Sequence, residues 1–225
     1  MVPPAADAPA RNDKRVRIVD AAVEVFAEKG FHGARISDIA RSASVADGTI
    51  YLYFRNKEDL LLTIFEEKME ALLGRLEVAL APCDDPLERI QVFARFHFGH
   101  LRTNPALAQV LQVELRQSTR FLRDYRPEKL WRYLDVFASL IADGQAAGVL
   151  RPDLDPFLVK WAFFGALDEL SMQWVLSRKR DRFNLDQAAD QVVEVFLRGM
   201  QAPAAVASSK PEKADFEQAG EHGTA

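Results

Sequence analysis

The sequence has almost no cysteine and no long apolar run, and each shortage excludes a class of protein. Of its 225 residues only Cys83 is a cysteine, which excludes an internal disulfide framework and fits a reducing compartment. No base neighbours Cys83 in sequence, so we interpret it as a loop thiol and not a nucleophile. The longest apolar runs, such as 161–166, are far shorter than the ~20 residues that cross a bilayer. The start of the chain is rich in Ala and Pro and lacks the pattern of a secretory signal. We therefore expect a cytoplasmic protein without a membrane partner.

Basic charge is not in excess either. The net charge is −4 and the isoelectric point is near 5.7, which argues against a protein that coats nucleic acid nonspecifically. Residues 1–60 carry nine basic and nine acidic side chains. Any affinity of this segment for DNA therefore has to come from where the charges lie, not from their number.

Features of enzymes are also missing. The sequence has no glycine-rich phosphate loop, no Ser-His-Asp order and no metal-binding cluster. His97 and His100 lie three residues apart, as metal ligands can, but no acidic residue supplies a third ligand on that turn. We therefore expect no catalytic residues, no metal and no cofactor.

What the sequence does contain is helical periodicity. No segment alternates β-branched and polar residues between hairpin turns, so an all-α fold is predicted. Composition sets a flexible arm (1–10) and a flexible tail (201–225) apart from a helical body over residues 11–200.

Two short helices with a brief joint are predicted near the N-terminus. They follow a helix over 11–29 that Gly30 is placed to end. Ser37 is the expected N-cap of a helix over 38–42, and the second short helix covers about 46–54. Helices joined so closely must cross steeply, which is helix-turn-helix geometry.

The later helices are marked by capping residues and prolines. Asn56 precedes a helix that ends before Pro82, Asp85-Pro86 begins the next, and Asn104-Pro105 breaks it. The remaining predicted helices cover 107–115, 127–148, 157–175 and 185–197. The last two are apolar on more than one stripe, which predicts a homodimer formed through these two C-terminal helices.

The second short helix has the composition of a recognition helix. Small or polar residues at its start would enter the major groove, where Thr49 can touch a base edge or a thymine methyl and Asp47 can accept from cytosine. Tyrosine and lysine side chains at its flanks can reach phosphates. The candidate DNA-contacting residues are Ser37, Asp47, Gly48, Thr49, Tyr51, Tyr53 and Lys57. The apolar side chains of Ile50, Leu52 and Phe54 are expected to be core.

These residues also carry a family resemblance. Ile18-Val19-Asp20-Ala21-Ala22, Phe26, Gly30, Ile39-Ala40 and the run from Gly48 to Leu60 resemble the DNA-binding domain of TetR-family regulators. The resemblance implies a fold of about nine helices. It divides the helical body into a three-helix DNA-binding domain, or head (11–56), and a six-helix effector-binding and dimerisation domain (57–200). It also implies a homodimer that binds a palindromic operator in double-stranded DNA.

Further segments resemble one group within that family, the FadR-type fatty acyl-CoA-responsive repressors of fatty acid degradation. The matching segments are 45–54, Glu114-Leu115-Arg116-Gln117-Ser118, Phe164-Gly165, Leu167-Asp168-Glu169 and Trp174-Val175. The resemblance covers most of residues 12–199 and implies that long-chain acyl-CoA is the effector that releases DNA.

A pocket for such a ligand needs an apolar tunnel and a basic mouth. Residues that fit the tunnel are Phe93, Phe96, His97, Leu107, Leu111, Phe137, Ile141, Phe163, Phe164 and Leu167. Arginines that fit the mouth are Arg116, Arg120, Arg123, Arg126 and Arg132. The resembling segments add Gln117, Asp168 and Trp174 to the candidate effector-binding residues. Ordinary core is the alternative for the apolar side chains, and a solvated ion-paired face is the alternative for the arginines.

The sequence therefore predicts a ligand-responsive transcriptional repressor, released from its operator by long-chain acyl-CoA and controlling fatty acid degradation genes. The alternative effectors are phenylacetyl-CoA, a drug or another hydrophobic small molecule such as a flavonoid. An enzyme acting on acyl-CoA and a structural helical adaptor remain as rival classes. The sequence does not give the operator, the regulated genes or the preferred chain length.

Overall fold

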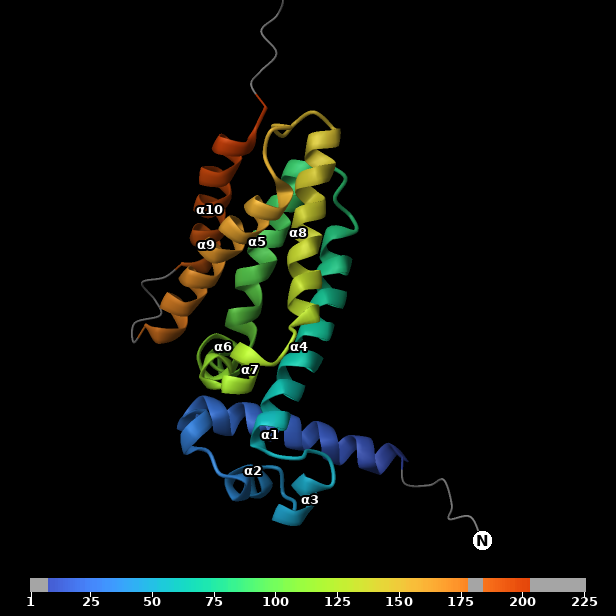
Figure 1. Ribbon diagram of the computed structural model, residues 1–225, viewed down its shortest axis with the longest axis vertical. Helices are drawn as coiled ribbons and strands as arrows, with labels where there is room; N and C mark the ends of the chain where they lie inside the picture. The colour runs from blue at the N-terminus through green and yellow to red at the C-terminus, as the bar shows by residue number, and fades with distance from the viewer. Residues whose placement is uncertain (1–7, 178–183, 203–225) are drawn as a thin grey trace, which may run out of the picture.

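The computed structural model describes residues 8–177 and 184–202, which form a small helical head beneath a tall bundle of long helices (Figure 1). The head contains α1 (Ala8–Gly33), α2 (Ile36–Ser42) and α3 (Asp47–Tyr51). The described residues contain no β-strand, only an isolated antiparallel bridge between Leu150 and Gln201. The predicted all-α fold is confirmed.

Helix α1 lies across the base of the bundle, and its N-terminal end projects beyond it (Figure 1). One face of α1 packs into the head core through fully buried Ile18, Ala22 and Phe26. Gly30 interrupts the helix with φ +73°, a conformation that favours glycine, and one further turn follows to Gly33.

Three expectations about helix ends in the head are wrong. Helix α1 begins at Ala8 and not at residue 11, so the last part of the predicted arm is helical, while residues 1–7 lie outside the described residues. The N-cap of α2 is Arg35, not Ser37, because the backbone of Arg35 is extended and its N–H donates to the Asp38 carboxylate (3.3 Å). Helix α3 ends at Tyr51, short of the predicted Phe54.

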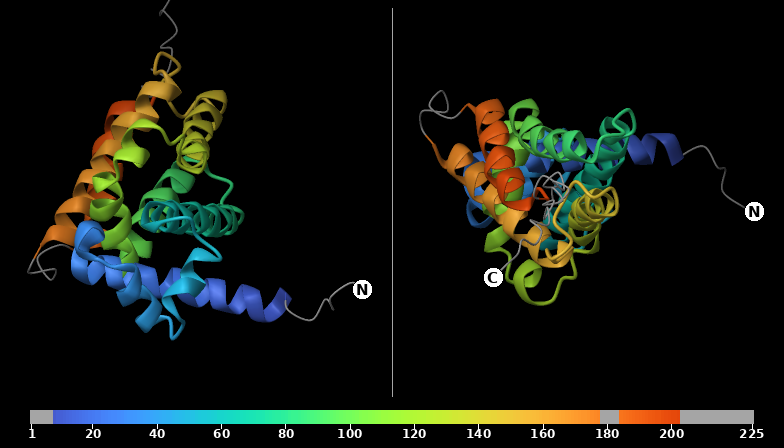
Figure 2. Two further views of the ribbon diagram at one scale, coloured as in Figure 1. Left: turned by 60° about the horizontal axis from the view of Figure 1, so that its bottom comes forward. Right: turned by 90° about the horizontal axis from the view of Figure 1, so that it is seen from above.

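One long helix leads from the head into the bundle. Helix α4 (Lys57–Leu80) begins where the Asn56 side chain accepts a hydrogen bond from the Asp59 N–H (2.8 Å), as predicted. Helix α5 (Pro86–Thr103) begins with the predicted Asp85 cap and Pro86. It packs against α8 (Glu128–Ala146) and α10 (Leu185–Met200), and α9 (Pro156–Leu176) packs against α8 and α10 (Figure 2).

The segment predicted as one helix over 107–115 is instead built from several short pieces. Helix α6 (Pro105–Gln109) continues into a π-helix (Val110–Glu114), a 3₁₀ turn (Leu115–Gln117) and α7 (Thr119–Arg123). A π-helix is a widened turn that frequently occurs at functional sites. This segment lies between the head and the bundle (Figure 1).

Several large apolar side chains are exposed on the C-terminal helices. Phe157, Leu158, Trp161 and Leu176 of α9 and Val195 of α10 are each at least 40% exposed. Such a group of exposed apolar side chains is typical of a protein interface. No helix among residues 8–177 and 184–202 is long and apolar enough to pass through a membrane. The predicted tail lies outside the described residues from 203 onward.

Candidate functional site

The first candidate site is the α2–turn–α3 unit at the foot of the head. The turn is closed by a hydrogen bond from the Val45 N–H to the Ala40 carbonyl (2.9 Å), with Ser44 at φ 55°. Ile39 and Ile50 are buried and fix the two helices to the head core. Because both helices are anchored from within, their outer faces are held in place for a rigid partner.

The predicted contact residues of α3 are on that outer face. Asp47, Gly48 and Tyr51 are exposed, and Thr49 is half-buried. No atom lies within 4 Å of where a Cβ on Gly48 would be, so this position leaves open space at the start of the helix. The arrangement suits close approach to a groove.

Leu52 is 71% exposed, so its assignment to the core is wrong. The helix ends one residue earlier, and the helical spacing used for the prediction no longer applies. Phe54 is buried, as expected, and Tyr53 is packed partly against the core. Tyr51 and Leu52 together extend the exposed surface of α3.

Lys57 makes contacts within the protein that the sequence did not reveal. Its Nζ donates to the carbonyls of His32 (3.3 Å) and Ala34 (2.9 Å), and it lies over the Phe31 ring. Partial burial lowers the pKa of Lys57. The ammonium group therefore ties the start of α4 to the end of α1. The contact of Lys57 with phosphate stays a prediction.

Ser37 is the second residue of α2 and is half-buried. It remains in the first turn, where backbone N–H groups are free, so its predicted contact with phosphate rests on position and not on a cap.

The second candidate site is a cavity of about 130 Å³, partly open to solvent, in the lower half of the bundle. The lining is mostly apolar and comes from every helix between α4 and α9. The lining residues are Phe65, Met69, Leu72, His97, His100, Leu101, Ala108, Leu111, Gln112, Leu115, Arg116, Phe121, Leu130, Tyr133, Phe164 and Asp168.

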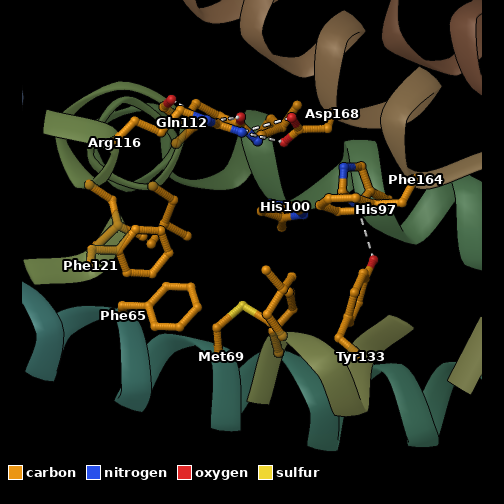
Figure 3. A pocket seen from close by; sticks show the side chains of 16 residues that line it. Phe65, Met69, His97, His100, Gln112, Arg116, Phe121, Tyr133, Phe164 and Asp168 are labelled. Carbon is orange, nitrogen blue, oxygen red and sulfur yellow. Dashed lines mark hydrogen bonds and ion pairs between the residues drawn. The ribbon is translucent and has the colours of Figure 1, made fainter. Parts of the chain in front are cut away.

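Three polar residues form one edge of the cavity (Figure 3). Arg116 Nη2 donates to both oxygens of Asp168, at 2.9 and 2.7 Å. Arg116 Nη1 donates to the side-chain oxygen of Gln112 (3.0 Å) and also to its backbone carbonyl. The Arg116 side chain is 40% exposed, so this edge reaches the surface.

A second polar group lies across the cavity. Nδ1 of His97 is 3.0 Å from the Tyr133 hydroxyl, and its Nε2 is 3.3 Å from Ser171 Oγ (Figure 3 shows the first contact). Burial, with His100 beside it, lowers the pKa of His97 well below its ordinary value, and burial lowers the pKa of His100 to about 4. Both imidazoles are therefore neutral at physiological pH.

The predicted effector-binding residues divide into two groups. The five that line the cavity are His97, Leu111, Arg116, Phe164 and Asp168. The apolar remainder lies in the packed core or against it: Phe93, Phe96, Leu107, Phe137, Ile141, Phe163, Leu167 and Trp174. Phe137 and Phe163 are stacked with ring centroids 4.2 Å apart, which leaves no space between them for a ligand.

The polar remainder lies beside the cavity. Gln117 donates to Glu114 (3.0 Å), and Arg120 lies 3.9 Å from Asp59. The side chains of Arg123, Arg126 and Arg132 are exposed. They are available to a charged group at the surface.

Sequence reasoning missed most of the wall that α4 and α8 supply. Phe65 and Leu72 of α4 and Tyr133 of α8 are not among the predicted effector-binding residues. Helical spacing shows that a face is buried but not whether its neighbour is another side chain or a void. The pair His97 and His100 did carry a signal, because buried histidines on one apolar face require a polar neighbour.

Glu114, which was also missed, connects the cavity wall to the head. Its carboxylate is 3% exposed and accepts the Phe31 N–H at 2.7 Å, directly after the break at Gly30. Gln109 and Gln117 donate to the same carboxylate, at 3.2 and 3.0 Å. Leu111, Gln112, Leu115 and Arg116 of the same segment line the cavity.

A second connection lies one turn further along the segment. The Glu58 carboxylate at the start of α4 accepts hydrogen bonds from the fully buried Ser118 hydroxyl (2.9 Å) and from the Arg120 N–H (3.4 Å). The segment 109–120 therefore lines the cavity on one side and contacts α1 of the head and the start of α4 on the other.

No group of three or more His, Cys, Asp or Glu residues that could hold a metal ion occurs within the described part of the chain.

Comparison with known proteins matches both sites to one family. Residues 18–64 match the family model of bacterial regulatory proteins of the tetR family, and residues 65–199 match that of the YsiA-like protein C-terminal region. The fatty acid metabolism regulator protein of Bacillus subtilis is 37% identical over 190 residues, covering 84% of this chain and 97% of that protein.

Two solved structures are similar over nearly the same span. The fatty acid degradation regulator FadR from Bacillus halodurans has a TM-score of 0.77 and 39% identity, covering 83% of this chain and 95% of that one. The transcriptional regulator FadR from Bacillus subtilis, in complex with stearoyl-CoA, has a TM-score of 0.76 and 38% identity, covering 82% and 98%.

Proposed function

The chain belongs to the TetR family of bacterial transcription regulators, and on this premise we propose that it is a repressor of fatty acid degradation genes that long-chain acyl-CoA releases from DNA. The observation that carries the proposal is the placement of the segment 109–120, which lines an apolar cavity and also contacts the head. The stearoyl-CoA complex of a 38% identical relative supports the same ligand class.

The DNA-binding part of the proposal rests on α3. Its exposed start would enter the major groove of a palindromic operator, and Thr49 would face base edges. Tyr51 and Tyr53 would flank the groove at the phosphates. Base contacts would set the sequence preference, while phosphate contacts would add affinity without selectivity.

The effector part rests on the chemistry of the cavity. Aromatic and aliphatic side chains of α4, α5 and α8 suit an acyl chain, and the polar edge at Arg116 suits its polar end. Each methylene buried contributes about 0.8 kcal/mol, so eight more carbons would add up to about 6 kcal/mol before ordering costs. Affinity should therefore rise steeply with chain length.

A homodimer would place two heads on the two halves of the operator. The exposed apolar side chains of α9 and α10 support these helices as the interface, because such a surface is rarely left to water.

Release requires a ligand that binds better to a conformation that cannot bind DNA. An acyl chain in the cavity would press on the segment 109–120, move its contacts with Phe31 and Glu58, tilt α4 and spread the two heads.

A second effector class is favoured by one observation. Four aromatic rings line the cavity, those of Phe65, Phe121, Tyr133 and Phe164. A short aromatic acyl-CoA such as phenylacetyl-CoA could pack against these rings.

Binding of candidate effectors to the purified protein tests the proposal without DNA. Calorimetric titration with octanoyl-, dodecanoyl-, palmitoyl-, stearoyl- and phenylacetyl-CoA should give dissociation constants that fall with each added pair of methylenes. Tightest binding of phenylacetyl-CoA would select the second effector class. Equal affinity for every acyl chain, or affinity no greater than that of free CoA, would contradict both.

A further inference from the structure

One side chain of the cavity has its hydrogen-bonding direction fixed by its neighbour. Gln112, which is 7% exposed, lines the cavity, and its Oε1 accepts a hydrogen bond from Arg116 Nη1 at 3.0 Å. A guanidinium can only donate, so the amide oxygen must face Arg116 and the amide nitrogen must face away from it. Among the described residues the Gln112 Nε2 group has no hydrogen-bond partner. Two N–H donors are thus left beside the cavity.

The polar group across the cavity cannot offer a donor. The Ser171 hydroxyl donates to the Leu167 carbonyl (2.8 Å), so its oxygen can only accept from His97 Nε2. The neutral imidazole of His97 then has a bare Nδ1, which accepts the single proton of the Tyr133 hydroxyl. Every proton in this chain of hydrogen bonds is used within the protein.

The terminal Nη donors of Arg116 are committed as well. Nη2 is held by both oxygens of Asp168, and Nη1 by the two oxygens of Gln112. His100 remains as a neutral ring whose Nδ1 is buried without a hydrogen-bond partner in the described part of the chain. Gln112 is therefore the lining residue whose N–H donors have no partner and whose amide orientation is fixed by a charged neighbour.

The position of Gln112 matches the carbonyl of an acyl thioester. It belongs to the polar edge that reaches the surface at Arg116, and the apolar wall of Phe65 and Met69 lies opposite (Figure 3). A ligand with its apolar chain against that wall and its polar end at the surface has its first polar atom at this edge. In an acyl-CoA this atom is the thioester oxygen, which accepts hydrogen bonds.

We propose that Gln112 donates a hydrogen bond to the thioester carbonyl of the bound acyl-CoA and that Arg116 positions its amide for this contact. The inference rests on the proposed function and adds its specificity: the site selects an acyl thioester and not only a long apolar chain. Asp168 holds Arg116 in place from α9, so the donor is oriented before the ligand arrives. Orientation in advance lowers the entropic cost of binding.

A pair of ligands that differ only at the carbonyl tests this contact. Stearoyl-CoA and S-octadecyl-CoA, in which a thioether methylene replaces the carbonyl, are titrated into the full-length protein. A neutral hydrogen bond contributes about 0.5–1.5 kcal/mol, so the wild type should prefer the thioester by roughly 2- to 13-fold. Equal affinity of the wild type for the two ligands would overturn the inference while leaving the proposed function intact.

Two variants locate the donor. Gln112→Glu keeps an oxygen for Arg116 but has no N–H, and Gln112→Met removes the donor with little change in size. Both should lose the preference for the thioester. As a control, Gln91→Glu at an exposed position of α5 adds the same charge outside the cavity, and this variant should keep the preference for the thioester. Retention of the preference in both Gln112 variants would overturn the inference, and its loss in His100→Leu instead would assign the contact to His100.

A spectroscopic measurement covers the case in which a variant binds poorly. The infrared carbonyl band of stearoyl-CoA labelled with ¹³C at the thioester should move to lower frequency when bound to the wild type than in an apolar solvent, because hydrogen bonding weakens the C=O bond. An unshifted band in the bound wild type would contradict the contact. Failure of the wild type to bind either ligand would instead overturn the proposed function, and the inference with it.

Discussion

At the scale of single residues, the exposed start of α3 sets the expected DNA contacts. Thr49 and Tyr51 are on the outer face of the recognition helix, Thr49 near its start and Tyr51 at its end. Thr49→Ala should lower affinity for the best operator and relax the preference at one base pair, a change of about 1–3 kcal/mol in discrimination. Tyr51→Ala should weaken all sequences about equally.

Fluorescence anisotropy with an operator and its single-base variants separates these effects. The exposed Val78→Ala on α4 lies outside the head and is the matched control. An unchanged sequence preference in the Thr49 variant would remove this residue from the base-reading surface.

The buried histidines predict how stability depends on pH. The pKa of His100 is about 4 in the folded protein and close to 6.5 when unfolded, so the unfolded state binds more protons between these values. Stability from this residue is present above pH 6.5 and is lost as pH falls toward 4. Between pH 7 and pH 5 the loss is about 2 kcal/mol. His97 changes stability in the same direction.

Urea unfolding of the wild type and of His100→Asn at both pH values measures the contribution of His100 to this loss of stability. Between pH 7 and pH 5, the free energy of unfolding of the variant should fall by about 2 kcal/mol less than that of the wild type. An equal loss in the two proteins would show that His100 does not carry the predicted proton linkage.

The caps of the long helices α4 and α5 were predictable from the sequence, whereas the predicted cap Ser37 was wrong and contacts with distant partners could not be predicted. Asn56 and Asp85 act within their own turn, where a side-chain oxygen and the next N–H groups meet. Lys57 looked like a phosphate contact, but its partners, the carbonyls of His32 and Ala34, lie more than twenty residues away. No local pattern signals such a pairing.

At the scale of elements, the segment 109–120 is where local sequence and structure diverge. The apolar spacing of residues 107–115 is compatible with one α-helix, but the structure has a π-helix over Val110–Glu114. This widened turn lets Leu111 and Gln112 line the cavity while Glu114 reaches Phe31 behind it. The π-helix ends at Glu114, whose partner Phe31 lies 83 residues away in the sequence, and no local pattern signals such a contact.

The same element gives a prediction about regulation. Glu114→Ala should leave the Phe31 N–H unpaired and weaken the link between cavity and head, at a cost of about 1–3 kcal/mol. Stearoyl-CoA should still bind, but the ratio of DNA affinities without and with ligand should fall severalfold. Anisotropy titrations of DNA at saturating ligand measure this ratio. The exposed Glu77→Ala on α4 should behave like the wild type, and an unchanged ratio in Glu114→Ala would contradict the link.

At the scale of the whole molecule, the exposed apolar side chains of α9 and α10 predict the assembly. Val195→Glu would place an unpaired carboxylate in the proposed interface, which is strongly unfavourable, whereas Val78→Glu adds the same charge on α4. Val195 and Val78 are 70% and 75% exposed, so neither change disturbs the core.

Sedimentation equilibrium should show a dimer for the wild type and Val78→Glu, and at least tenfold weaker dimerisation for Val195→Glu. The DNA affinity of Val195→Glu should fall together with its dimerisation. A dimer of unchanged strength in both variants would place the interface elsewhere.

Architecture and family were readable from the sequence at this scale, because head motifs and helix caps are local. The cavity was readable only in part, because its shape depends on how six or more elements leave space between them. Five predicted residues line it, the other apolar ones fill the core or pack against it, and the polar ones lie beside the cavity.

A mobility shift with the DNA upstream of the protein's own gene tests the central claim most directly. The protein should retard this DNA, and stearoyl-CoA should release it at a lower concentration than octanoyl-CoA, with free CoA inactive. A complex that persists at every concentration of acyl-CoA, or a protein that retards no fragment, would contradict the account.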